Sequence, residues 1–99
     1  MRHDHAAELK LAASRLDGTA KHTQIIASPV LSEMTGHTIL LKPENLQVTG
    51  SFKIRGAYNK IASLTDEELE RGIVTASAGN HAQGVAYAAR ERGAKATIL

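Results

Sequence analysis

The stretch IVTASAGNHAQGVAYAARERGAKATIL, residues 73–99, decides the fold class. It opens at 73–76 with three β-branched residues followed by an alanine, which is typical of a strand, and the small residues at 77–80 then predict a turn. A helix is predicted over 81–92, and residues 95–99 begin another strand. Strand, helix and strand in this order predict two parallel strands joined by a right-handed crossover.

The alternation of strands and helices extends upstream of this stretch. An apolar run at 38–41 predicts a further strand, and helical spacing of apolar residues predicts a helix over about 52–62. The sequence at 65–68 has the capping-box pattern of a helix start, and that helix should stop near Gly72. We therefore expect an α/β fold with a partial parallel sheet and flanking helices, in which all three apolar runs are strands of one sheet.

Two helices and a connector are predicted in the first third of the chain. Apolar residues recur at helical spacing over about 4–16, and residues 19–28 form a connector. A serine followed by a proline then starts a short helix that ends at Gly36. We expect its apolar residues Leu31 and Met34 to face inward.

Length and composition narrow the class of protein. The 99 residues suffice for one small domain or a piece of a larger one, with 42% hydrophobic and 22% charged residues. A net charge of +2 and only 3% aromatic residues give no basis for nucleic-acid binding. The chain has no cysteine, no membrane-length apolar run and no apolar leader, so we expect a cytoplasmic protein without a membrane partner.

The run TGSFKIRGA, residues 49–57, contains the first candidate for chemistry. Its glycine and serine lead into a helix and place Lys53 in the first turn, where free backbone N–H groups and the positive helix end favour a neutral amine. A neutral amine can condense with an aldehyde. The alternative is a solvated helix lysine, which is the common case. Ser51 could contact a cofactor or cap the helix, and we favour the cap.

The second candidate is SAGNHAQG, residues 77–84, between a predicted strand and helix. Parallel α/β folds place ligands at the carboxyl ends of strands, and a helix start favours an anion such as a carboxylate. The spacing matches neither a dinucleotide fingerprint nor a Walker loop. The alternative is an ordinary strand-to-helix turn with Asn80 as the N-cap.

These two runs carry a resemblance to a known family. Residues 42–57 resemble the cofactor-lysine segment of threonine and serine dehydratases and serine racemases, and residues 77–84 resemble that family's Ser-x-Gly-Asn-His loop. The resemblance covers about residues 22–99. It implies the tryptophan synthase beta-like fold of fold type II pyridoxal-phosphate enzymes. Residues 1–99 are then expected to be the amino-terminal portion of a catalytic domain, and an uncovered last strand suggests that this portion is truncated.

The resemblance also implies a cofactor and its ligands. Pyridoxal 5'-phosphate would be held by Lys53 as a Schiff base, and the released Lys53 amine would remove the substrate Cα proton. Phe52 would lie beside the cofactor ring, and Asn80 would hydrogen-bond its phenolic oxygen. No metal is implied. The substrate carboxylate would lie against Ser77, Gly79, Asn80 and His81.

The implied reaction is dehydration and deamination of L-threonine or L-serine to a 2-oxo acid and ammonia, as in threonine ammonia-lyases of isoleucine biosynthesis. Ala78 stands where similar serine racemases carry a serine, which disfavours a two-base racemase. Serine racemase and β-replacement synthase remain alternatives, as does a non-catalytic fragment that binds a partner or effector. The family's glycine-rich phosphate loop comes later in the chain, so activity of the isolated chain is left open. A homo-oligomer is expected for the full-length protein.

Overall fold

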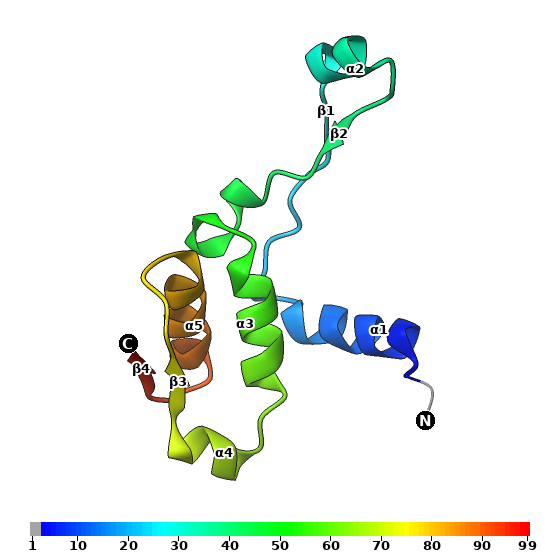
Figure 1. Cartoon of the computed structure of the whole chain (residues 1–99). Helices are drawn as coiled ribbons and strands as arrows, with labels where there is room; N and C mark the ends of the chain where they lie inside the picture. Colours follow the sequence, from blue (N-terminus) through cyan, green and yellow to red (C-terminus); the bar gives the residue numbers. More distant parts are fainter. Residues whose placement is uncertain (1–2) are drawn as a thin grey trace.

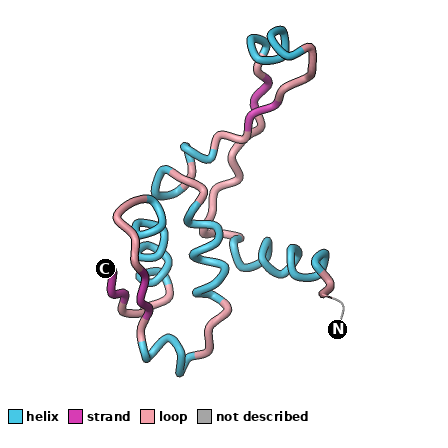
Figure 2. The backbone as a smooth tube through the Cα atoms, in the orientation of Figure 1, coloured by secondary structure: helices cyan, strands magenta, loops and turns pink. Residues whose placement is uncertain are grey.

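The structure is a computed structural model that describes residues 3–99, with a compact body and a projecting arm (Figures 1 and 2). Within the described residues, no helix combines the length and apolarity needed to cross a membrane. The elements in chain order are α1 (His5–Leu16), β1 (Ile26–Ala27), α2 (Pro29–Thr35), β2 (Leu40–Leu41), the 3-10 helices η1 (Glu44–Leu46) and η2 (Val48–Gly50), α3 (Lys53–Ala62), α4 (Asp66–Arg71), β3 (Ile73–Thr75), α5 (Asn80–Glu91) and β4 (Ala96–Ile98).

The body contains the predicted strand–helix–strand unit. Strands β3 and β4 are parallel, and their register pairs Ile73 with Ala96 and Thr75 with Ile98. Helix α5 connects them, and α3 lies beside α5 with both helices beginning at the same end of the body (Figure 1). The α/β class and this parallel pair are therefore confirmed, and the carboxyl end of β3 leads directly to the start of α5.

The core of the body lies between α3 and α5. Helical spacing on α3 turns Ile54, Ala57 and Ile61 toward α5, and all three are buried. The buried residues of α5 are small or β-branched, so the two backbones approach closely. The buried hydrophobic residues are Ile54, Ala57, Ile61, Val85, Ala88 and Ala89.

The closest approach of the two helices is at Gly84 of α5. A Cβ atom built on Gly84 would lie 3.1 Å from the carbonyl carbon and oxygen of Lys53 and 3.2 Å from the amide nitrogen of Ile54. These neighbours are main-chain atoms, which cannot move aside as a flexible side chain can. Because Gly84 has no side chain, α5 can lie this close to the start of α3.

The arm consists of β1, α2 and β2, and it projects from the body (Figures 1 and 2). Its two strands pair antiparallel with each other, Ile26 with Leu41 and Ala27 with Leu40. The prediction that residues 38–41 join the parallel sheet is thus wrong. The reason is that β2 pairs with β1, a strand within the segment predicted as a connector, and the two form a separate sheet.

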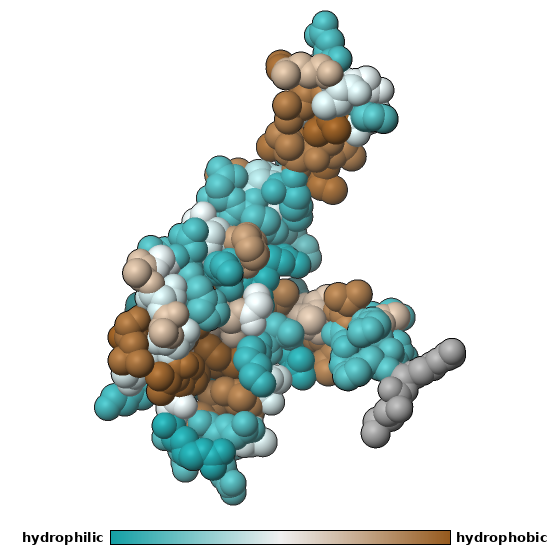
Figure 3. Space-filling view, viewed as in Figure 1, coloured by the Kyte–Doolittle hydropathy of each residue, from teal (hydrophilic) through white to brown (hydrophobic). Residues whose placement is uncertain are grey.

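Apolar side chains of the arm face outward, as Figure 3 shows. Leu31 is 39% exposed and Met34 76% exposed, so the prediction that they face inward is wrong. A helix of seven residues on a pair of two-residue strands offers no interior into which these side chains could turn. The cap predictions for α2 are confirmed, since the Ser28 hydroxyl accepts from Leu31 N and Gly36 ends the helix at φ 70°.

The overall shape is open for a chain of this mass. The accessible surface is 7346 Å² for 10.6 kDa, whereas a compact monomer of that mass exposes about 5,500 Å². The radius of gyration is 16.5 Å, against about 13 Å for a compact domain of similar length. Stabilising burial is therefore concentrated in the α3–α5 core, and the arm adds little to it.

The first prediction concerns the helix contact at Gly84. Gly84→Ala should lower the free energy of unfolding by about 1–3 kcal/mol, because the new methyl group forces two backbones apart. Gly56→Ala is the matched control, since Gly56 lies in α3 with no atom within 4 Å of an added Cβ. That change should raise stability by about 0.5–1 kcal/mol. Urea unfolding followed by circular dichroism measures both, and equal effects would contradict the packing argument.

The second prediction concerns the capping box at the start of α4. The Thr65 hydroxyl accepts from Glu68 N, and Thr65 N donates to the Glu68 carboxylate. This backbone hydrogen bond, followed by that from the Thr65 hydroxyl, lowers the pKa of Glu68 from its ordinary 4.5. A lowered folded-state pKa stabilises the fold above the ordinary value and loses that effect as the pH falls through the lowered value.

The urea midpoint of Glu68→Ala should therefore lie below that of the wild type at about pH 7, and the gap should close as the pH falls through the lowered pKa of Glu68. Glu67→Ala, in the same first turn, is the control and should show a smaller pH-dependent gap. A gap for Glu68→Ala that does not change with pH would rule out the carboxylate as its cause.

Candidate active site

The loop before α3 has an unusual backbone. Thr49 adopts φ 67° and Gly50 φ 79°, both in the left-handed region, which a β-branched residue such as threonine rarely enters. The chain then becomes extended at Ser51, whose buried hydroxyl accepts from Lys53 N at 3.3 Å. The interpretation of Ser51 as the N-cap of α3 is wrong, because Phe52 occupies that position and no side-chain cap bond is made from it. The Ser51 hydroxyl still satisfies the N–H of Lys53, the first residue of the helix.

The Lys53 amine lies beside an aromatic ring. Its Nζ is 5.2 Å from the centroid of the Phe52 ring, which is within cation–π range. Within residues 3–99, no hydrogen bond or ion pair engages this nitrogen. Phe52 itself is 59% exposed, so its ring has an open face. The side chain of Lys53 can thus react without first breaking a hydrogen bond or ion pair to the described part of the chain.

The start of α5 offers hydrogen-bond donors. The Ser77 hydroxyl accepts from Gly79 N and Ala82 N, at 3.3 Å each, and so caps the helix. The alternative with Asn80 as the N-cap is wrong, because Asn80 is the first helical residue and Gly79 occupies the N-cap position. Within the described chain, the main-chain N–H groups of Asn80 and His81 find no acceptor. Such a helix start is suited to bind an anion.

The two candidate segments come together at one end of the body. Gly84 contacts the Lys53 main chain, and it lies only about 6 Å along the helix axis from Asn80. Both helices begin at the end of the body where β3 finishes (Figure 1). The main chain of Lys53 and the donors at 79–81 therefore belong to one region of the fold, at the carboxyl end of a parallel strand.

The side chains in this region differ in their access to solvent. Gly79 and Asn80 are exposed, whereas Ser77, His81 and Lys53 are half-buried. A primary amine fits the aldehyde of pyridoxal phosphate, and main-chain N–H groups at a helix start fit a carboxylate. The residues present thus fit the cofactor that the sequence resemblance implies, by the chemistry of their donor and acceptor groups.

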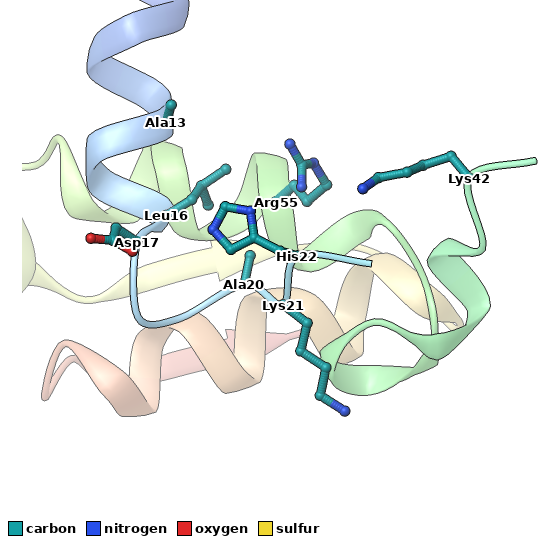
Figure 4. Close-up of a pocket in the computed structure, with 8 residues that line it drawn as sticks. All are labelled: Ala13, Leu16, Asp17, Ala20, Lys21, His22, Lys42 and Arg55. Atoms are coloured by element: carbon teal, nitrogen blue, oxygen red, sulfur yellow. The ribbon is translucent and has the colours of Figure 1, made fainter. Parts of the chain in front are cut away.

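A well-formed hollow in the structure lies apart from Lys53. It has a volume of about 150 Å³ and is bordered by α1, the connector and α3 (Figure 4). Figure 4 shows His22, Lys42 and Arg55 around it, with Lys21 directed away. Lys42 Nζ donates to the carbonyl of Thr23.

Arg55 forms an ion pair with a carboxylate of η1. Its Nη1 lies 3.6 Å from Glu44 Oε1, and the Glu44 side chain is only 17% exposed. The arginine therefore links α3 to η1, and its side chain also borders the hollow in Figure 4.

Gln47, in the segment that precedes Lys53, is a buried polar residue that the sequence analysis did not identify. It is 4% exposed and its side chain bonds to the main chain of Lys21, 26 residues away. It falls in a segment that reads only as polar and turn-rich. A contact at that distance along the chain leaves no periodicity in the sequence, so pattern analysis could not have found it.

Comparison with known proteins supports the resemblance. The family model described as "Pyridoxal-phosphate dependent enzyme" matches residues 16–99. The L-threonine ammonia-lyase of Thermotoga maritima is 60% identical over 92 residues, which are 93% of this chain and 23% of that protein. The chain thus spans about a quarter of the length of this curated relative.

Solved structures of similar sequence share the fold. Maize serine racemase matches with a TM-score of 0.87 and 40% identity, over 93% of this chain and 29% of that one. The processed form of threonine deaminase isoform 2 from Solanum lycopersicum matches with a TM-score of 0.77 and 37% identity, over 97% of this chain and 28% of that one. The described chain therefore has the backbone fold of a part of these larger enzymes, and its sequence is 40% and 37% identical to theirs.

Proposed function

The chain belongs to the family of pyridoxal-phosphate-dependent enzymes, and from this premise we propose that it supplies the lysine of an active site for dehydration and deamination of L-threonine or L-serine. The products would be a 2-oxo acid and ammonia. The observation that carries the proposal is that the main chain of Lys53, whose amine has no hydrogen-bond or ion-pair partner within residues 3–99, contacts Gly84 near the start of α5. The 60% identity to an L-threonine ammonia-lyase supports the choice of reaction.

The cofactor, when bound, supplies an electron sink for negative charge at the substrate Cα. In this proposal the Lys53 Nζ holds the cofactor and then accepts the Cα proton as a general base. Phe52, whose ring has an open face next to this nitrogen, limits where the cofactor ring can lie. The side-chain amide of Asn80 donates to the phenolic oxygen.

The substrate carboxylate is assigned to the start of α5. The N–H groups of Asn80 and His81 have no acceptor within residues 3–99, and the helix end adds a positive potential. Gly79 leaves space for a ligand to approach the main chain, since no described atom lies within 4 Å of a Cβ built there. Ser77 uses its oxygen as a cap, so its hydroxyl hydrogen remains available to the carboxylate.

Serine racemase is the main alternative, because the maize enzyme has the same fold at 40% identity. Ala78 favours the dehydratase. A two-base racemase needs a proton donor on the opposite face of Cα, and alanine has no proton to give. A β-replacement synthase would share Lys53 and the carboxylate loop, and a non-catalytic module that binds a partner or effector would use neither.

Further proposals concern the whole protein. We propose that residues 1–99 form the amino-terminal portion of a catalytic domain, which is supported by their 23% share of the Thermotoga relative. A role in isoleucine biosynthesis, a cytoplasmic location and a homo-oligomeric state stay predictions.

The third prediction tests the cofactor lysine. Incubation of the full 99-residue chain with pyridoxal phosphate, followed by borohydride, should give an adduct on Lys53 at least about fivefold more often than on Lys60, by peptide mass spectrometry. Lys60 is the internal control because it lies exposed on the same helix. Lys53→Arg should remove the preferred adduct without lowering the urea midpoint. An even distribution over the lysines would refute the proposal.

The fourth prediction tests the reaction. In the full-length protein that contains residues 1–99, loaded with cofactor, L-threonine should give 2-oxobutanoate, which is measured by coupled reduction, and Lys53→Ala should lower this rate by about 10³-fold. The product separates the alternatives. D-serine from L-serine would indicate a racemase, and a thioether formed with an added thiol would indicate a β-replacement synthase. Unchanged turnover in Lys53→Ala would contradict the role of this lysine.

A further inference from the structure

Gln47 is a buried polar residue at the junction of η1 and η2. Its Oε1 accepts from Lys21 N at 2.8 Å and from Val48 N at 2.9 Å. Its Nε2 donates to the Lys21 carbonyl and to Glu44 Oε2, at 2.9 Å each. Both hydrogens of the amide and its oxygen are thus used, which fixes the side chain in one orientation.

These four bonds join segments that are distant in sequence. Lys21 lies in the connector between α1 and the arm, whereas Glu44 lies in η1. The Glu44 carboxylate continues the chain of contacts to Arg55 of α3, at 3.6 Å. One amide group therefore joins the connector to η1 and, through a carboxylate, to the helix that begins with Lys53.

The main chain of Gln47 also holds the loop before Lys53. Its carbonyl accepts from Gly50 N at 2.8 Å, which closes the turn that contains Thr49 at φ 67°. A β-branched residue persists in that region only when its surroundings hold it there. The turn passes directly into Ser51, whose hydroxyl accepts from Lys53 N at the start of α3. Gln47 thus restrains the loop that determines where α3 starts.

We propose that Gln47 is a positioning residue for the Lys53 amine. Its side chain and carbonyl hold residues 48–52 in the strained turn, and so keep Lys53 at the place where α5 begins. This role rests on the proposed function of Lys53 and adds a residue that touches neither cofactor nor substrate. It requires an amide at position 47, because a carboxylate of the same shape would face the Glu44 carboxylate and lose both donors.

The test uses Gln47→Glu in the full 99-residue chain, with Gln24→Glu as the matched control of the same charge on an exposed connector residue. The readout is the ratio of borohydride-trapped pyridoxal phosphate on Lys53 to that on Lys60. Gln47→Glu should lower the ratio at least about threefold at neutral pH, since like charges directly opposed repel. Gln24→Glu should leave it at the wild-type value. Amide hydrogen exchange of residues 48–54 should rise only in Gln47→Glu.

Two rescues distinguish positioning from general destabilisation. Lowering the pH to protonate one of the two carboxyl groups should return the ratio of Gln47→Glu toward the wild-type ratio at that pH. The double variant Glu44→Gln with Gln47→Glu removes the opposed charges but leaves the Lys21 carbonyl without its donor, so it should recover the ratio only in part at neutral pH. This variant also covers the case in which Gln47→Glu alone fails to fold.

The possible failures are separable. If the wild type shows no preference for Lys53 over Lys60, the proposed function itself fails. If the wild type shows the preference and Gln47→Glu keeps it, the positioning role is overturned while the function of Lys53 stands. A ratio that falls equally in Gln47→Glu and Gln24→Glu also overturns it, because the effect would then come from added charge alone.

Discussion

The close approach of α5 to the first residue of α3 is the contact on which the rest of the structure depends. Gly84 permits main-chain contact with Lys53, and the small side chains of Ala88 and Ala89 continue the approach along the helix. This contact buries Ile54 completely and brings the two helix starts to the same end of the body. The packing of the body and the position of Lys53 are therefore consequences of one interaction.

The starts of α3 and α5 are alike in how their first N–H groups are satisfied. The hydroxyls of Ser51 and Ser77 each accept from an N–H in the first turn of the helix that follows, and neither serine is the residue adjacent to its helix. The start of α5 keeps further main-chain N–H groups at this end of the body. A site built this way positions a ligand mainly with backbone groups, so it tolerates change in many surface side chains while it restricts its glycines and serines.

Much of the fold could be predicted from sequence because its signals are local. The capping box at Thr65 and the proline start of α2 are patterns of adjacent residues, and the structure shows both. The pairing of β2 with β1 and the bonds of Gln47 to Lys21 depend on residues that are distant along the chain. The prediction that Leu31 and Met34 of α2 face inward failed for the same reason. Helical spacing identifies an apolar face of a helix, but it does not say whether another element covers that face. For the site, the motifs located Lys53 and residues 77–84, and packing alone explains why they meet.

The distribution of the core along the chain bears on how the body forms. Among the described residues, every buried hydrophobic side chain lies between Ile54 and Ala89, and none comes from the arm or from α1. The contacts of this core join α3 to α5, which are separated in the chain by α4 and β3, so a loop must close before they can form. During synthesis this core is complete only once α5 has been made. The arm is made earlier, so its apolar surface is exposed to water before the body has formed.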